Sequence, residues 1–60
     1  MDRADAATWP EFMTTEQVAW AIGVKDQRTV LALIRAGTLP ATRIGHAYRV
    51  SKAAVLGLLR

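Results

Sequence analysis

The first periodic stretch of the chain carries an apolar stripe with helical spacing. Three side chains share one face at about 100° per residue, namely Val18, Ala21 and Ile22. Thr14 is a natural N-cap, and Gln17 three residues later completes a capping box. Gly23 provides a stop, because glycine adopts the left-handed conformation that ends many helices. The pattern predicts a short helix over residues 15–22.

A second stretch repeats the helical period. Its apolar face consists of Val30, Leu33 and Ile34. Asp26 can cap the start and Gly37 can end the stretch, which predicts a helix over residues 27–36. The opposite face carries basic, polar and small side chains: Arg28, Ala32 and Arg35, flanked by Gln27, Thr29 and Leu31. Two short helices joined by a tight turn predict a helix-turn-helix, whose second helix enters the DNA major groove.

Beyond this helix the period changes to two. Leu39 and Pro40 end the helical region, and two strands are predicted over residues 41–44 and 47–50. Gly45 and His46 form the tight turn between them. A hairpin this small is not stable alone, so we expect it to pack on the helices as a wing with a projecting tip.

Alternation along the hairpin assigns its side chains to two faces. Ile44, Tyr48 and Val50 are expected to face the helices, whereas Arg43 and Arg49 are expected to be available to solvent or phosphate. After the hairpin, Ser51 can cap a third helix that runs toward residue 60. Its apolar stripe contains Val55, Leu58 and Leu59.

These elements predict a mainly α fold with a small β-hairpin: a winged helix-turn-helix of three helices and a two-stranded wing. The domain covers residues 13–60 and follows an N-terminal arm over residues 1–12. Residues 1–8 are polar or small without periodicity, which predicts a loose segment.

Aromatic residues flank the first helix. Trp9, Pro10 and Phe12 are expected to form a lid over one end of the core, in preference to a surface that docks a partner. Trp20 points away from the apolar face of its helix. It either folds back onto the N-terminal aromatics or stands exposed as a protein contact.

Charge is unevenly distributed within the net charge of +3. Residues 1–16 hold four acidic residues and one arginine, whereas residues 17–60 hold seven basic residues and one acidic residue, Asp26. A strongly basic domain is typical of nucleic-acid binding, although a solvated basic face is the ordinary alternative.

The composition also argues against other classes of protein. The chain has no cysteine and one histidine, so we expect no disulfide, metal site or cofactor. No nucleophile or carboxylate pair accompanies the histidine, so we do not expect an enzyme. No apolar run approaches the roughly 20 residues that cross a bilayer, and no signal peptide is recognisable, which predicts a cytoplasmic protein with no membrane partner.

The second helix supplies the first candidate DNA contacts. Arg28 lies near the helix start and is expected to bind a guanine in bidentate fashion, because the start of a recognition helix enters deepest. Arg35 is expected to anchor a phosphate. Gln27 and Thr29 either contact base edges or support the cap. Leu31 and Ala32 complete this face, and the small Ala32 permits close approach to the groove.

The wing and two lysines supply the other candidate DNA contacts. Arg43 and Arg49 are expected to contact the DNA backbone or the minor groove, whose narrowness concentrates negative potential. Their structural alternative is pairing with Glu16 or Asp26. His46 at the tip is a minor phosphate candidate, as are Lys25 and Lys52.

The order of elements resembles the MerR-like winged helix-turn-helix, and the residues resemble those of the small phage excisionase family. The resemblance runs from Met13 to Leu59. It rests on Met13, Thr14, Glu16, Val18, Ala19, Ile22, Gly23, Val24, Thr29, Val30, Ile34, Gly37, Leu39, Pro40, Arg43, Gly45, Tyr48 and Arg49.

Three features depart from the family pattern. The turn before Thr29 has one additional residue, with Asp26 at the capping position that serine usually holds. Trp20 occupies a position that is usually polar, and His46 stands at a wing tip that is often basic.

The resemblance implies a protein that binds and bends double-stranded DNA beside phage attachment sites. It also implies head-to-tail binding of neighbouring copies and an integrase partner that is directed toward excision, in a bacterial cytoplasm and close to the nucleoid. Because no dimerisation helix is predicted, direct repeats are expected rather than palindromic half-sites. The alternatives are a small transcriptional regulator and a protein-interaction module that docks through its N-terminal aromatics.

Overall fold

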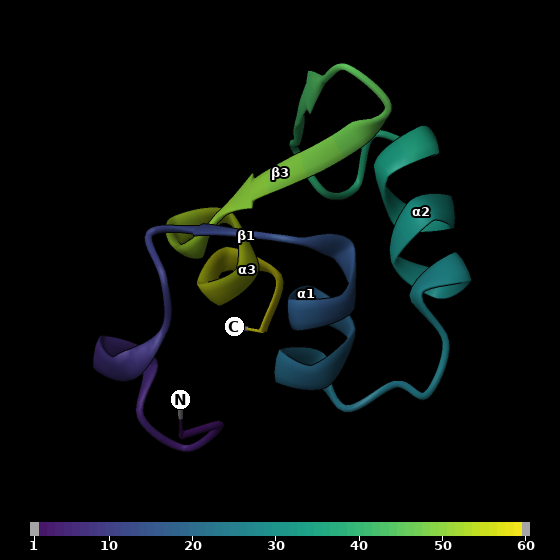
Figure 1. Cartoon of the computed structure of the whole chain (residues 1–60). Helices are drawn as coiled ribbons and strands as arrows, with labels where there is room; N and C mark the ends of the chain where they lie inside the picture. Colours follow the sequence, from purple (N-terminus) through teal and green to yellow (C-terminus); the bar gives the residue numbers. More distant parts are fainter. Residues whose placement is uncertain (1, 60) are drawn as a thin grey trace.

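The computed structural model describes residues 2–59. Met1 and Arg60, the outer limits predicted for the arm and the domain, lie outside the described residues. The elements are the 3-10 helix η1 (Ala6–Thr8), β1 (Phe12–Met13), α1 (Thr15–Ile22), α2 (Gln27–Arg35), β2 (Thr42–Ile44), β3 (Ala47–Ser51) and α3 (Lys52–Leu59). Figure 1 shows α2 and the hairpin on one side of the molecule and the N-terminal segment on the opposite side.

The predicted fold class is confirmed: three α-helices and a two-stranded hairpin form a winged helix-turn-helix. A capping box begins α1, because the Thr14 hydroxyl accepts from the Gln17 N–H at 3.1 Å and the Gln17 Oε1 accepts from the Thr14 N–H at 2.9 Å. Gly23, with φ +83°, ends this helix as predicted.

The second helix is one residue shorter than predicted. Asp26 caps it through its side chain, and Ala36 is the C-cap rather than the last helical residue. Gly37 follows with φ +77°, a conformation that stops the helix and turns the chain toward the hairpin. Helix α1 packs directly on α2, and the turn at Gly37 leads from α2 toward the wing.

The sheet has three strands in the order β1-β3-β2, one more than predicted. Phe12 pairs with Ser51 and Met13 with Val50, so β1 adds an antiparallel strand to β3. Two residues are too few to show a period of two, which is why the sequence pattern gave no sign of this strand.

The face predicted for Ile44 is wrong. The two-residue turn pairs Ile44 with Ala47 and Arg43 with Tyr48. Cross-strand partners point to the same face, so Arg43 shares the face of Tyr48 and Val50, and Ile44 shares the opposite face with Arg49. Ile44 is accordingly 62% exposed, whereas Val50 is fully buried.

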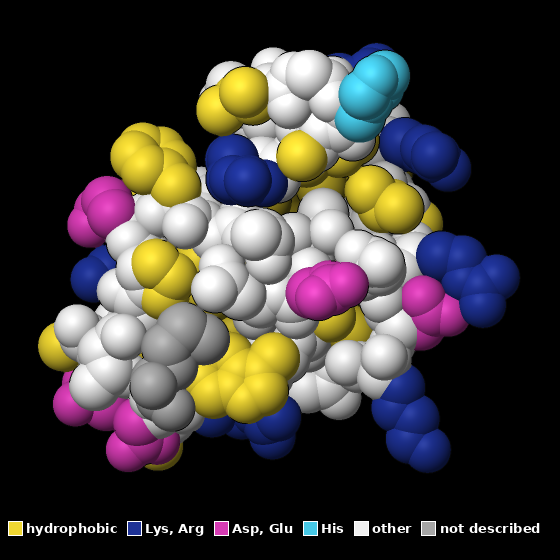
Figure 2. Space-filling view, viewed as in Figure 1, with side chains coloured by type: hydrophobic (Ala, Val, Ile, Leu, Met, Phe, Trp, Pro, Cys, Tyr) yellow, Lys and Arg dark blue, Asp and Glu magenta, His cyan; other side chains and the backbone are white. Residues whose placement is uncertain are grey.

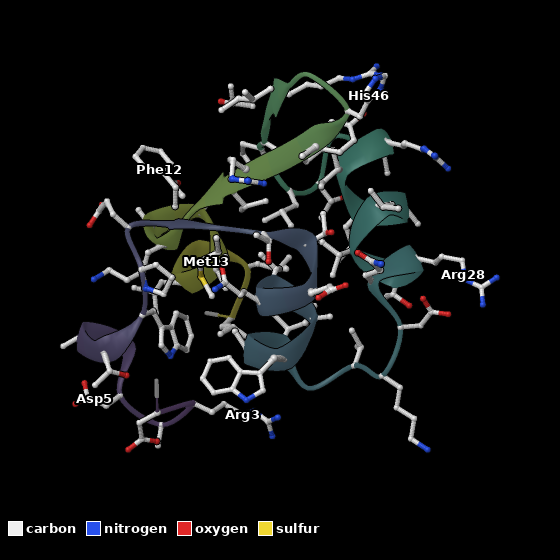
Figure 3. The ribbon with its side chains drawn as sticks, in the orientation of Figure 1. Arg3, Asp5, Phe12, Met13, Arg28 and His46 are labelled. Carbon is white, nitrogen blue, oxygen red and sulfur yellow. The ribbon has the colours of Figure 1, made fainter. Side chains whose placement is uncertain are left out.

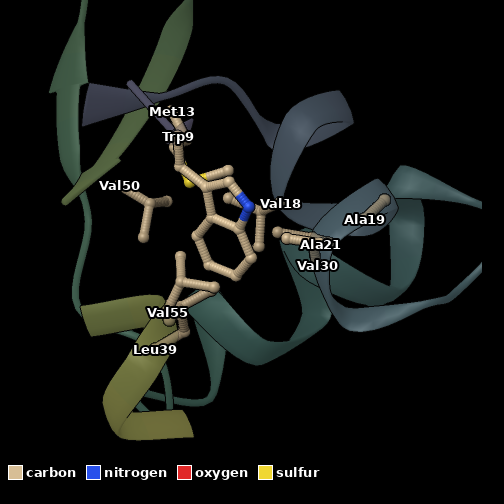
Figure 4. Packing of buried hydrophobic residues seen from close by; sticks show 9 residues of the cluster. All are labelled: Trp9, Met13, Val18, Ala19, Ala21, Val30, Leu39, Val50 and Val55. Atoms are coloured by element: carbon tan, nitrogen blue, oxygen red, sulfur yellow. The ribbon is translucent and has the colours of Figure 1, made fainter. Parts of the chain in front are cut away.

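Every α-helix, together with the turn after α2 and two strands, contributes to one small core. Its buried residues are Trp9, Met13, Val18, Ala19, Ala21, Val30, Leu39, Val50 and Val55. Figure 4 shows the Trp9 indole among Met13, Val50 and Val55. In α3, Val55 is buried and Leu58 half-buried as predicted, but Leu59 is 49% exposed in the last turn.

The segment before β1 is folded, which corrects the prediction of a loose arm. The Trp9 indole N–H donates to the Asp2 carbonyl at 2.8 Å, and the Thr8 hydroxyl donates to the Asp5 carbonyl at 2.7 Å. Trp9 therefore acts as the predicted lid, whereas Phe12 is 63% exposed and does not. The division of the chain at residue 13 stays a prediction. No helix within residues 2–59 is long and apolar enough to cross a membrane.

Candidate nucleic-acid interface

A groove of about 610 Å³ lies between α2, the start of α1 and the hairpin. Its lining combines three arginines and a histidine with polar and apolar side chains. The lining residues are Thr14, Thr15, Glu16, Gln27, Leu31, Arg35, Arg43, His46, Ala47, Tyr48 and Arg49. Helix α2 forms one wall and the wing forms the other.

The face of α2 that lines the groove is rotated from the predicted DNA-binding face, whose centre is Ala32. Gln27, Leu31 and Arg35 line it at successive helical turns. Arg28, Thr29 and Ala32 are exposed, as predicted for the face opposite the core, but they lie beside the groove rather than in it. The helix consequently offers both a groove wall and an outer surface to a ligand.

The wing brings its three candidate residues to the same groove. Arg43 and His46 are exposed, and Arg49 is half-buried. The Arg43 Nε–H donates to the Gly45 carbonyl at 3.1 Å, and an Arg49 Nη1–H donates to the Tyr48 carbonyl at 3.2 Å. These contacts hold both guanidiniums against the hairpin backbone. The predicted alternative, pairing with Glu16 or Asp26, is not present among the described residues.

Arg28 has an acidic partner on its own helix terminus. Its Nε–H donates to the Asp26 Oδ2 at 2.8 Å, and its Nη2 lies 2.8 Å from the same oxygen. The Arg28 backbone N–H donates to the Asp26 Oδ1 at 2.9 Å. The hydrogen bond from the Arg28 side chain, followed by that from its backbone, lowers the pKa of the Asp26 carboxyl. With its side chain 85% exposed, Arg28 stays accessible to a ligand.

The two lysines lie outside the groove. Lys25 is exposed in the turn before α2. Lys52 is half-buried at the start of α3, where its backbone N–H donates to the Glu11 carbonyl at 2.8 Å, which places it beside the start of β1. Lys25 therefore adjoins the recognition helix, and Lys52 does not.

Trp20 folds back onto the N-terminal segment, the first of its two predicted alternatives. Its ring makes an edge-to-face contact with Trp9 at a centroid distance of 6.2 Å. The Arg3 guanidinium lies 5.5 Å from the Trp20 ring centroid, within the range of a cation–π contact. Trp20 is half-buried and lines a second groove of about 510 Å³ with Arg3 and residues of the α1–α2 turn.

Residues at the start of α1 also line the main groove, which the sequence pattern does not predict. The Thr15 hydroxyl donates to the Gln27 Oε1 at 2.7 Å, which joins the starts of α1 and α2. Glu16 places a carboxylate in the otherwise basic lining. The capping signal had located both residues at a helix start, but their proximity to α2 depends on how the helices cross.

Basic side chains are concentrated along one edge of the molecule. Figure 2 shows Lys and Arg side chains along the edge formed by α2 and the hairpin, with the histidine at the hairpin tip. Acidic side chains lie over the N-terminal segment, and two more, those of Glu16 and Asp26, lie at the basic edge itself. In Figure 3, Arg28 and His46 project from the same side, and Phe12 and Asp5 lie away from it. This basic edge is the surface best suited to a polyanion.

Comparison with known proteins adds one match. A family model described as a helix-turn-helix domain matches residues 12–60. No curated protein and no solved structure matches the chain significantly. The matched range includes α1, α2, the whole sheet and the groove between them.

Proposed function

The chain belongs to the helix-turn-helix domain family that matches residues 12–60, and on that premise we propose that it is an excisionase. Helix-turn-helix domains bind DNA, and DNA binding is the general function of this chain. In the proposed role it binds and bends DNA beside phage attachment sites and directs an integrase toward excision. It acts without catalysis or a cofactor, and neighbouring copies bind head to tail.

The convergence of α2 and the wing on one basic groove carries the proposal. Arg35 from the helix and Arg43 and Arg49 from the hairpin line this groove together. When a recognition helix lies in the major groove, its side chains contact base edges while cations beside it contact the adjacent phosphate backbone. Contacts on two separate elements also allow the protein to stabilise a bent duplex, because bending brings more phosphates within reach.

The glycines of the resemblance stand where the fold requires them, which supports the excisionase-like interpretation. Gly23 and Gly37 end the two helices of the helix-turn-helix with positive φ, and Gly45 turns the wing at φ +63°. The three glycines of the family pattern therefore mark the three places where the chain reverses direction to create the groove.

Footprinting tests the proposal. The purified protein is bound to DNA that surrounds its own gene, including any neighbouring recombinase gene and attachment-like repeat. Tandem protected sites about 10 bp apart beside such a repeat would support an excisionase. An excision assay with the neighbouring integrase then tests the directional role, and excision that proceeds equally without the protein would contradict it.

A small transcriptional regulator is the second candidate, because the same groove would serve it. Protection confined to a promoter, with no effect on excision, would favour this function. Neither outcome changes the assignment of α2 and the wing to DNA.

A protein-interaction module is the third candidate, and the 63% exposure of Phe12 is the observation that favours it. Joint neutralisation of Arg28 and Arg43 distinguishes this function. It should weaken binding of an excisionase or a regulator to its DNA site, and it should leave a protein contact made through Phe12 unchanged.

A further inference from the structure

The Asp26 carboxylate performs two tasks at the start of α2. Its Oδ1 accepts from the Arg28 backbone N–H at 2.9 Å, which caps the helix. Its Oδ2 accepts from the Arg28 Nε–H at 2.8 Å and lies 2.8 Å from Nη2. A cap needs only the first of these contacts, so the second requires a separate explanation.

The contacts at Oδ2 occupy one edge of the guanidinium and leave the other edge exposed. Arginine has a side edge formed by Nε and Nη2 and an end edge formed by Nη1 and Nη2. Asp26 takes the side edge. The end edge keeps a pair of N–H donors, the arrangement that matches O6 and N7 of guanine.

We propose that Asp26 is a positioning residue that makes Arg28 a reader of guanine rather than a phosphate contact. This inference rests on the proposed DNA binding and deepens it by assigning its specificity. The carboxylate fixes the direction of an otherwise mobile side chain at the exposed start of the recognition helix (Figure 3).

The charge of Asp26 supports the same assignment. A carboxylate in contact with the guanidinium repels phosphate oxygens and offsets the attraction of Arg28 for the DNA backbone. The same negative charge weakens a hydrogen bond from Arg28 to guanine less than it weakens a phosphate contact, because O6 and N7 are dipolar acceptors without a full charge. The pair thus lowers affinity for arbitrary DNA more than affinity for a site with guanine at the right position.

The ionisation of Asp26 fits this role at physiological pH. Hydrogen bonds from the Arg28 side chain and backbone lower the pKa of the carboxyl from its ordinary value of 3.8. The carboxylate is therefore charged wherever the protein would meet DNA.

The decisive variant is Asp26→Ser, because serine keeps an N-cap and removes the carboxylate. Glu16→Gln is the matched control: it removes another negative charge, one in the groove lining, and leaves the Arg28 pair intact. Arg28→Ala and the double variant Asp26→Ser/Arg28→Ala complete a double-mutant cycle. Thermal unfolding of each variant confirms that it is folded before binding is measured.

Duplexes are first selected from a random pool with the wild-type protein, and affinity is then measured for the selected and the random duplexes. For Asp26→Ser we expect tighter binding to random DNA and a specificity ratio that falls about tenfold. Glu16→Gln should strengthen binding to both duplexes by a similar factor. Replacing the critical guanine by 7-deazaguanine, which lacks the N7 acceptor, should weaken the wild type and have little effect on Asp26→Ser.

Two results would overturn the inference. The first is that Asp26→Ser, like Glu16→Gln, changes the affinity for the selected duplex and the affinity for the random duplex by the same factor. The second is that Asp26→Ser still lowers the specificity ratio when Arg28 is alanine. Either result would mean that Asp26 acts only as a cap and a charge. DNA binding itself survives in that case. If the wild type enriches no sequence and binds no duplex, the proposed function fails together with this inference.

Discussion

Arg28 and Arg35 lie about two turns apart on α2, and the structure gives them different surroundings. Arg28 is held by Asp26 at the exposed start of the helix, whereas Arg35 lines the groove that also contains Arg43. The difference separates a side chain suited to a base edge from one suited to the backbone.

Alanine substitutions should reveal this division. Arg28→Ala is expected to cost about 1–3 kcal/mol at the selected site and little on random DNA, because it removes a base contact. Arg35→Ala should weaken binding to both duplexes alike, because it removes a phosphate contact. Titration of each variant with both duplexes measures the effects. Equal losses for Arg28→Ala on the two duplexes would make Arg28 a phosphate contact instead.

The Asp26–Arg28 pair also predicts a pH dependence of stability. The pKa of Asp26 is lower in the folded protein than its ordinary value of 3.8. The stabilisation is therefore present above about pH 3.8 and is lost as the pH falls through the lowered folded value.

Melting curves of the wild type and Asp26→Asn between about pH 2 and pH 6 test this dependence. Asparagine keeps the cap without the charge, so the variant should lose less stability than the wild type over the acid range. Parallel loss in the two proteins would show that the pair contributes nothing to folding.

At the scale of elements, the N-terminal segment is part of the folded domain. Trp9 is 5% exposed and packs in the same cluster as residues of α1, β3 and α3. Its indole N–H donates to the Asp2 carbonyl, so one side chain ties the start of the N-terminal segment to the core. Phe12, three residues later, is 63% exposed.

The contrast between these two aromatics gives a stability prediction. Trp9→Ala should cost about 3–5 kcal/mol, because it removes a buried aromatic ring from a small core. Phe12→Ala should change the free energy of unfolding by no more than about 0.5 kcal/mol. Urea unfolding followed by circular dichroism measures both. A large loss for Phe12→Ala would mean that its ring is covered in solution.

At the scale of the whole molecule, the clustering of basic residues determines the response to salt. The basic edge of α2 and the wing lies away from the acidic N-terminal segment (Figure 2), and its acidic neighbours are Glu16 and Asp26. A duplex therefore meets one basic surface rather than a molecule of uniform charge. Binding there releases counterions from every neutralised phosphate.

The salt dependence of DNA affinity measures how many cations engage. If about five neutralise phosphates, log K should fall with log salt at a slope of about −4 to −5. Arg35→Ala and Arg43→Ala should each reduce the magnitude of the slope by about one. Lys52→Ala serves as the control outside the groove, and a wild-type slope near zero would contradict DNA binding altogether.

The local part of the fold could be predicted from the sequence because its causes are local. Thr14 and Asp26 cap the helices with their own side chains, and Gly23 and Gly37 end them with left-handed backbone. Each signal acts within one turn of the chain, so helix boundaries followed to within a residue. The exposure of Arg28, Ala32 and Arg35 followed in turn from the apolar period of α2.

Features that depend on contacts between elements required the tertiary structure. The hairpin register reversed the predicted face of Ile44 and placed Arg43 with Tyr48, because one residue of shift exchanges the faces. Packing against Trp9 chose between the two alternatives for Trp20.

The sequence by itself determined the three α-helices and the hairpin, their order, the basic face of α2 and the resemblance that indicates DNA binding. Only the tertiary structure decided which basic residues of α2 and the hairpin line one groove together, and that Glu16 lies in the same groove. The physical reason is distance along the chain. Capping and periodicity act between neighbours in sequence, whereas the groove exists only after Gly23, Gly37 and Gly45 have turned remote segments toward one another.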